Sequence, residues 1–218
     1  AAVVTLDGRV TAALETAGLL WLTVELLGCQ CEEIACGERE IFDNNVVGTR
    51  YRWHAAAQGG VVRVVFSGSL SATGHRADRP TDETEPFNPF ERHLPYSYTK
   101  AAVEHECLKA FADGLPVIMA TSCAILGPND FKPSRMGQLM IDYARGRLPA
   151  YVPGGFEFVA AHDIVEGHVL AMSKGRPGQK YIFSTEFMTL DTLFDLYRDL
   201  TGQQKRPLRL PPGPIAGM

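Results

Sequence analysis

The chain has 218 residues, of which 45% are hydrophobic and 21% are charged. These values are close to those of an average globular protein, so they exclude an intrinsically disordered or collagen-like chain. The formal net charge is −4, from 21 basic and 25 acidic residues, and the basic residues are scattered along the sequence. This pattern argues against partners such as nucleic acid or an anionic membrane surface.

Neither a membrane span nor a signal peptide is predicted. No uninterrupted apolar run reaches the length of about 18 residues that a transmembrane helix needs, and no basic segment precedes an apolar stretch at the N-terminus. The five cysteines are an odd number, for which reduced thiols are the default. Cys29, Cys31 and Cys36 lie close together, but no second Cys or His pair accompanies them, so we expect no metal. The sequence therefore predicts a soluble, cytoplasmic protein.

The first predicted element is a helix over residues 45–58, which Gly59 and Gly60 end. The apolar stretch before it, residues 10–27, has no consistent period and predicts neither helix nor strand. A strand follows over residues 61–66 and stops at Ser67-Gly68-Ser69.

A second helix is predicted over residues 98–112 and a second strand over residues 115–120. Both strands are nearly continuous apolar runs, which is typical of strands buried on both faces of a parallel sheet. The order of helix, strand, helix and strand is typical of βαβ units, so the sequence predicts an α/β fold.

The sequence pattern changes after Gly127. Helices are predicted over residues 137–146, 163–173 and 189–201, and a short strand over residues 181–184. The last helix has one apolar face and a candidate N-cap at Thr189 or Asp191. We expect a core over residues 1–127, with an incomplete N-terminal part, and a mixed region over residues 128–218 that holds a small lobe and the last helix.

The candidate chemistry lies at Ser69, Tyr96 and Lys100. Tyr96 and Lys100 are four residues apart, so on a helix both project from the same face. An ammonium beside a phenol favours the ionised phenol, and a serine hydroxyl at the end of a strand can donate to a carbonyl oxygen. Together, the phenol can move a proton and the serine hydroxyl can stabilise an oxyanion. Hydride transfer to or from a carbonyl requires both. The Tyr-x-x-x-Lys spacing alone also arises by chance in helices.

Five motifs in a fixed order resemble the extended short-chain dehydrogenase/reductases, also called the NAD-dependent epimerase/dehydratase family. The resemblance extends over about residues 39–210, and its motifs are Asn45-Val46-Val47-Gly48-Thr49-Arg50, Val64-Val65-Phe66-Ser67-Gly68-Ser69, Tyr96-x-x-x-Lys100, Ile125-Leu126-Gly127-Pro128 and Ala161-His162-Asp163-Ile164. Residues 132–134 and 144–152 are most similar to the dihydroflavonol-reductase-like and hopanoid-associated branch.

The resemblance implies a doubly wound, mostly parallel Rossmann-type sheet with a small C-terminal substrate-side lobe. It also implies NAD(P)-dependent oxidation or reduction of a carbonyl/alcohol pair on a small organic or sugar-derived substrate. Tyr96 would be the general acid/base, Lys100 would favour its ionised form and hold the nicotinamide ribose, and Ser69 would polarise the carbonyl. The residues implied to contact NADP or NAD are Ser67, Tyr96, Lys100, Ser122 and Cys123. A homodimer through residues 45–58 and 98–112 is also implied.

Two features depart from the family. Its Gly-x-x-Gly-x-x-Gly turn, which holds the cofactor pyrophosphate at a helix N-terminus, is absent from the sequence, and Thr121-Ser122 replaces a Pro-containing pair. Three explanations are open: the residues are part of a longer enzyme, the chain is a short relative that lost redox chemistry, or the N-terminal residues depart from the true sequence. The alternative function is a non-redox scaffold or binding protein. Without the Gly-rich turn, we expect these 218 residues to bind NAD(H) or NADP(H) no tighter than about millimolar.

Overall fold

The computed structural model describes residues 37–75, 79–88 and 95–211, and the backbone of segments 2–4, 10–13 and 22–24. The chain forms two compact units. The first comprises Ala1–Ser122 and Val165–Phe183, and the second comprises Cys123–Ile164 and Ser184–Met218. The chain passes into the second unit after Ser122, a few residues before the expected boundary at Gly127, and returns to the first unit at Val165. The returning segment includes the strand at residues 180–183, which joins a sheet of the first unit.

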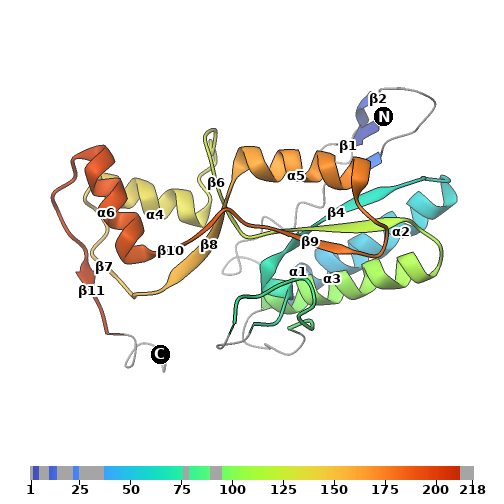
Figure 1. Cartoon of the computed structure of the whole chain (residues 1–218), viewed down its shortest axis with the longest axis horizontal. Helices are drawn as coiled ribbons and strands as arrows, with labels where there is room; N and C mark the ends of the chain where they lie inside the picture. The colour runs from blue at the N-terminus through green and yellow to red at the C-terminus, as the bar shows by residue number, and fades with distance from the viewer. Residues whose placement is uncertain are drawn as a thin grey trace. The chain divides into compact units, whose positions relative to one another are not determined.

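The parallel sheet of the first unit has the strand order β4, β5, β9 (Figure 1). These strands are β4 (Val64–Ser69), β5 (Val117–Ser122) and β9 (Lys180–Phe183). The first strand was predicted to stop at Ser67-Gly68-Ser69, and these three residues are its last ones, which pair in register with Ala120 to Ser122 of β5. Both strands start later than predicted. The N–H groups of Val61 and Leu115 donate to carbonyl groups in the last turn of the preceding helices, so these residues belong to the helix ends.

Helices cover both faces of this sheet (Figure 1). Val64 and Phe66 point to the face that packs against α2 (Gly48–Gln58) and α3 (Pro95–Ala112). Val65, between them, points to the opposite face, where Ala171 and Met172 of α5 (Ala161–Lys174) cover it. Burial of both faces explains the continuous apolar runs and confirms the predicted doubly wound α/β fold.

The helix predicted over residues 45–58 begins earlier and is not uniform. It consists of α1 (Glu38–Phe42), the π-helix η1 (Asp43–Val47) and α2. The helix predicted from residue 98 also begins earlier, at Pro95. Proline is well suited to the first turn, where its missing N–H has no intrahelical partner. The earlier start places Tyr96 in the first turn of α3.

The second unit combines short strands with two amphipathic helices. Its three-stranded sheet has the order β10 (Glu186–Thr189), β8 (Gly155–Ala160), β6 (Ala124–Leu126), and a further pair joins β7 (Ala150–Tyr151) to β11 (Leu208–Arg209). The helices are α4 (Arg135–Ala144) and α6 (Leu190–Thr201). Tyr143 stacks on Phe194, with ring centroids 4.7 Å apart, in the core of this unit. Thr189 caps α6 by accepting from the Thr192 N–H, as one of the two predicted caps.

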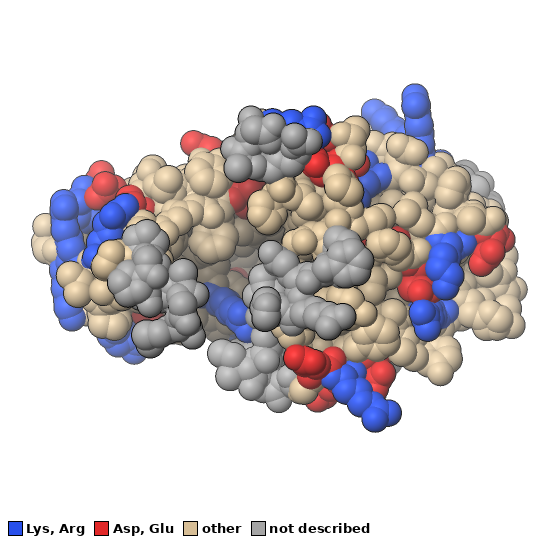
Figure 2. Space-filling view, turned by 90° about the horizontal axis from the view of Figure 1, so that it is seen from below, with Lys and Arg blue, Asp and Glu red and all other residues tan. Residues whose placement is uncertain are grey.

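The N-terminal segments are described as three short strands. β1 (Ala2–Val4) pairs antiparallel with β2 (Val10–Ala13) and parallel with β3 (Leu22–Val24). Cys29, Cys31 and Cys36 lie outside the described residues. Among the helices that are described, none is long and apolar enough to cross a membrane. Basic and acidic side chains are intermixed on the face shown in Figure 2.

Candidate functional site

The candidate site lies at the carboxyl edge of the parallel sheet of the first unit. Ser67 and Ser69 are at the end of β4, and Ser122, the register partner of Ser69, is the last residue of β5. In α/β proteins, ligands bind outside this edge, where loops and helix termini converge. The structure therefore brings three of the predicted residues to one edge.

Tyr96 and Lys100 share a face of α3, as their spacing predicts. The Lys100 ammonium lies 5.4 Å from the centroid of the Tyr96 ring. Lys100 is only 6% exposed, whereas Tyr96 is half-buried. Within the described part of the chain, no group accepts a hydrogen bond from this ammonium. A buried cation of this kind favours a hydroxyl-bearing or anionic ligand.

Ser69 is held by its neighbour Ser71, which sequence reasoning did not identify. The Ser69 and Ser71 hydroxyls lie 2.8 Å apart, and the Ser71 N–H donates to the Ser69 oxygen at 3.4 Å. Ser69 is the N-cap of the 3-10 helix η2 (Leu70–Ala72), which contains Ser71 and packs against α3. This packing directs the end of β4 toward the helix that carries Tyr96 and Lys100.

The other residues predicted to contact a cofactor have partners in the protein. The Ser67 hydroxyl lies 2.8 Å from Nε2 of His168, and the Ser122 hydroxyl donates to the Gly68 carbonyl at 3.3 Å. Cys123 begins the second unit and is buried. Burial, with a smaller contribution from Glu157, raises the pKa of its thiol to about 11. The thiol is therefore protonated at neutral pH and is a poor nucleophile.

The start of α3 is fixed by a hydrogen-bonded chain from the π-helix. Asn45 of η1 donates through its Nδ2 to the Thr99 hydroxyl at 3.0 Å, and that hydroxyl donates to the Tyr96 carbonyl at 2.9 Å. Asn45 and Thr99 are both buried. The chain therefore connects the Asn-Val-Val-Gly-Thr motif directly to the Tyr-x-x-x-Lys motif. π-helical turns are frequent at functional sites.

Beneath the site lies a buried polar cluster. Glu104, which is fully buried, forms an ion pair with Lys180 of β9 at 2.6 Å. Burial raises the pKa of Glu104 above its ordinary value, while Lys180, Thr121 and Lys100 lower it. A Cβ added to Gly68 would lie 2.7 Å from the Thr121 hydroxyl and 3.1 Å from the Glu104 carboxylate. Any side chain at position 68 would therefore collide with this cluster, which explains why a glycine lies between Ser67 and Ser69.

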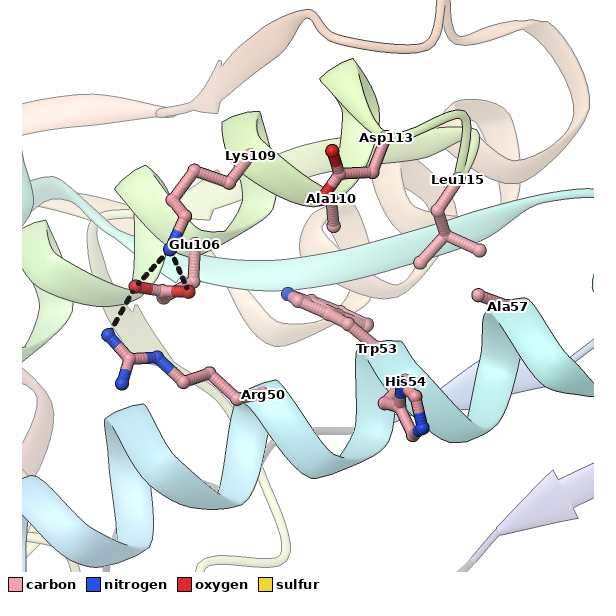
Figure 3. A pocket seen from close by; sticks show the side chains of 9 residues that line it. All are labelled: Arg50, Trp53, His54, Ala57, Glu106, Lys109, Ala110, Asp113 and Leu115. Atoms are coloured by element: carbon pink, nitrogen blue, oxygen red, sulfur yellow. Dashed lines mark hydrogen bonds and ion pairs between the residues drawn. The ribbon is translucent and has the colours of Figure 1, made fainter.

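A hollow of about 300 Å³ lies between α2 and α3 (Figure 3). Glu106 of α3 joins Arg50 of α2 at 2.7 Å and Lys109 of its own helix at 3.2 Å at one end of the hollow. These are the helices expected to form a dimer. Within the two ranges expected to form the dimer, Val46 and Val103 lie in the core of the first unit.

The second unit has its own hollow, of about 530 Å³. Its lining is mainly apolar and includes Leu126, Met140, Ile141 and Tyr197. Asp130 also lines it, and its carboxylate accepts from the Ser134 N–H and hydroxyl at the start of α4. Asp130 is thereby occupied in capping the helix.

Comparison with known proteins identifies the family. Residues 35–183 match the model of the NAD dependent epimerase/dehydratase family. The chain is 39% identical over 183 residues to sterol demethylase protein B of Methylococcus capsulatus, covering 84% of this chain and 56% of that protein. It is 28% identical over 167 residues to a putative dihydroflavonol 4-reductase of Synechocystis, covering 74% of this chain and 49% of that protein. The chain thus spans about half the length of the curated relatives it matches.

Solved structures of other proteins have the same fold as this chain. The crystal structure of gox2253 is 32% identical and superimposes with a TM-score of 0.80 over 87% of this chain and 58% of its own. UDP-glucose 4-epimerase from Thermotoga maritima, at 24% identity, shares the fold with a TM-score of 0.74 over 88% of this chain and 64% of its own. The chain belongs to the NAD-dependent epimerase/dehydratase family of enzymes, the extended short-chain dehydrogenase/reductases.

Proposed function

We propose that this chain acts as an NAD(P)-dependent oxidoreductase on a carbonyl/alcohol pair of a small organic or sugar-derived substrate. The observation that carries the proposal is the buried Lys100 ammonium, 5.4 Å from the Tyr96 ring centroid, on a helix that packs against the turn after Ser69. Buried lysines are rare unless they are paired. A lysine beside a half-exposed phenol suits acid/base work better than packing.

The residues at this edge fit the nicotinamide end of a dinucleotide. A bound nicotinamide would supply or accept the hydride. Lys100 has no hydrogen-bond acceptor among the described side chains, so the hydroxyls of a ribose would satisfy its ammonium. Tyr96 would share that ribose, and the sheet edge at Ser67 and Ser122 would lie beside it. Cys123 would contribute through its backbone, because its thiol is buried.

Tyr96 would move the proton at the substrate oxygen. In reduction its phenol donates to the forming alkoxide, and in oxidation its phenolate accepts the proton of the alcohol. The nearby Lys100 ammonium favours the phenolate. Ser69 accepts the N–H of Ser71 and can accept its hydroxyl proton, which leaves the Ser69 O–H to donate to the substrate oxygen. The hydroxyl is therefore oriented before the substrate arrives.

Ring substrates are the first to test. Two relatives carry the names of a sterol demethylase protein and a putative dihydroflavonol 4-reductase, which suggests a ring ketone or a secondary ring alcohol. The assays extend to millimolar dinucleotide, so that weak binding is also detected.

The experiment has a binding step and a turnover step. NADPH and NADH at millimolar concentration are first titrated into the protein by saturation-transfer NMR, and we expect saturable binding that Lys100→Met weakens. Sterol ketones, dihydroflavonols and UDP-glucose are then screened by loss of the nicotinamide absorbance band. Turnover that Tyr96→Phe abolishes supports the proposal. Absence of saturable dinucleotide binding would contradict it and favour the non-redox scaffold.

A further inference from the structure

The buried cluster beneath the site contains one carboxylate and two lysines. Glu104 lies one helical turn after Lys100 on α3, and it is fully buried. Lys180 approaches the same carboxylate from β9, at 2.6 Å from Oε2. Residues four apart on a helix are neighbours on its surface. Glu104 therefore has two cations within reach and forms a close ion pair with only one of them.

Lys180 is held in place from three sides. Besides Glu104, its ammonium donates to the Thr73 hydroxyl at 3.1 Å and lies 4.8 Å from the centroid of the Phe87 ring. Its side chain is only 7% exposed. Thr73 and Phe87 are themselves paired as an isolated β-bridge in the segment between Ser69 and α3. Lys180 thus connects β9, α3 and that segment.

We propose that Lys180 is a positioning residue, which holds the Glu104 carboxylate so that the Lys100 ammonium stays with Tyr96. The inference rests on the proposed function, since it assigns a purpose to the cation beside the phenol. Lys180 itself contacts Glu104, Thr73 and Phe87 and is not among the residues proposed to contact the cofactor or the substrate. Its partner Glu104 connects the sheet to the helix that carries both site residues.

The reason is the cost of an unpaired buried charge. A buried carboxylate that loses its partner must find another cation or become protonated. The charged or titratable groups that act on Glu104 among the described residues are Lys180 from β9, and Lys100 and Cys107 from α3 itself. β5 contributes only the Thr121 hydroxyl. At the alkaline pH where a phenol ionises, protonation of Glu104 is unfavourable, so Lys100 becomes its partner and leaves Tyr96.

The test measures the pH at which the Tyr96 phenol ionises, in the protein without cofactor or substrate. Tyrosine labelled with ¹³C at Cζ is followed by NMR over a pH titration, and Tyr96→Phe assigns the Tyr96 signal. In Lys180→Met we expect the midpoint to move to higher pH by about one unit. In the double variant Lys180→Met/Glu104→Gln, which has no buried carboxylate, we expect a midpoint close to that of the unchanged protein.

The double variant separates positioning from a structural role. Both variants lose the contacts of Lys180 with Thr73 and Phe87, so a purely structural role predicts the same shift in both. Equal shifts, or no shift in Lys180→Met, would overturn the proposal. Lys109→Met is the matched control, because the exposed Lys109 pairs with a different carboxylate, Glu106, on the same helix, and it should leave the midpoint unchanged.

Should Lys180→Met not fold, Lys180→Gln replaces it, because an amide can still bond to Thr73 while carrying no charge. The same expected shift and the same contradicting outcomes apply to it. The titration needs no turnover. A protein that transfers no hydride but shows the shift and its rescue would contradict the proposed function alone, whereas a reductase without the shift would contradict this inference alone.

Discussion

Lys100 is a charged side chain in a position that water hardly reaches. Its ammonium contacts the ring of Tyr96, and the buried carboxylate of Glu104, one helical turn away on α3, is paired with Lys180. In the proposed function, this cation would favour the phenolate, which is the form that accepts a proton from an alcohol. At the residue scale, the proposed function therefore depends on where two lysines place their charges.

The Lys100→Met variant tests this effect. Methionine keeps the length and packing of the side chain but removes the charge. We expect the low-pH limb of the alcohol-oxidation profile to move to higher pH, because the phenol loses the cation that favours its ionised form. The measurement is the pH dependence of kcat at saturating dinucleotide. An unshifted limb with a lower amplitude would show that Lys100 only holds the ribose.

Gly68 offers a second test at the residue scale. A methyl group there would lie 2.7 Å from the Thr121 hydroxyl and 3.1 Å from Glu104. We expect Gly68→Ala to lower the free energy of unfolding by about 1–3 kcal/mol, as overpacking usually does. Urea unfolding followed by circular dichroism measures it. Gly154→Ala is the control, because nothing lies within 4 Å of its added Cβ, and equal stability of the two variants would contradict the account.

At the scale of elements, the start of α3 depends on a single hydroxyl. Thr99 accepts from Asn45 of η1 and donates to the Tyr96 carbonyl. We expect Thr99→Val, which keeps the shape and removes the hydroxyl, to destabilise the protein by about 1–3 kcal/mol, the cost of losing hydrogen bonds at a buried site. Turnover should fall as well, because Tyr96 lies in the same turn.

Thr99→Ser is the matched control for this element, because it restores the hydroxyl without the methyl group. Thermal unfolding and turnover of the two variants should therefore separate, with serine close to the unchanged protein. If valine and serine gave the same loss, the methyl packing of Thr99 would matter and the hydrogen-bonded chain would not.

The elements that could be predicted from sequence are those with a strong apolar pattern. β4 and β5 are buried on both faces, so their apolar runs are continuous. Their ends were predicted less well, because Ser67 to Ser69 and Thr121 to Ser122 pair as strand residues although they are polar. In the second unit, β8 follows Pro153 and Gly154 and is only partly buried, so it has no clear alternation to detect.

The candidate site was predictable only where its residues are local. Tyr96 and Lys100 are one turn apart, and Ser69 ends a recognisable strand. Lys180 could not be connected to this site from sequence, because its partner Thr73 is 107 residues away. A buried Glu104 inside a helix also carries no local signal, since most glutamates on helices are exposed. Folding brings these residues together through the β5–β9 pairing.

At the scale of the whole molecule, we expect a homodimer through α2 and α3. Tyr51 of α2 is 72% exposed. The hollow lined by Arg50 and Glu106 lies between the same two helices (Figure 3). An exposed aromatic side chain beside charged groups is typical of an interface. Light scattering at micromolar concentration should give twice the monomer mass. Tyr51→Asp should lower this mass to that of a monomer, whereas Leu200→Asp, at an equally exposed position on α6, should not. A monomer mass for the unchanged protein would contradict the prediction.

The central claim is that Tyr96 moves the proton at the substrate oxygen. Its most direct test is the turnover number of Tyr96→Phe, with the substrate that the screen identifies and saturating NADPH or NADH. Phenylalanine keeps the ring that packs beneath the Lys100 ammonium and removes only the transferable proton. We expect kcat to fall by roughly 10²–10⁴, the contribution of a positioned acid/base, with the circular dichroism spectrum unchanged. A kcat close to that of the unchanged protein, with the fold intact, would contradict it.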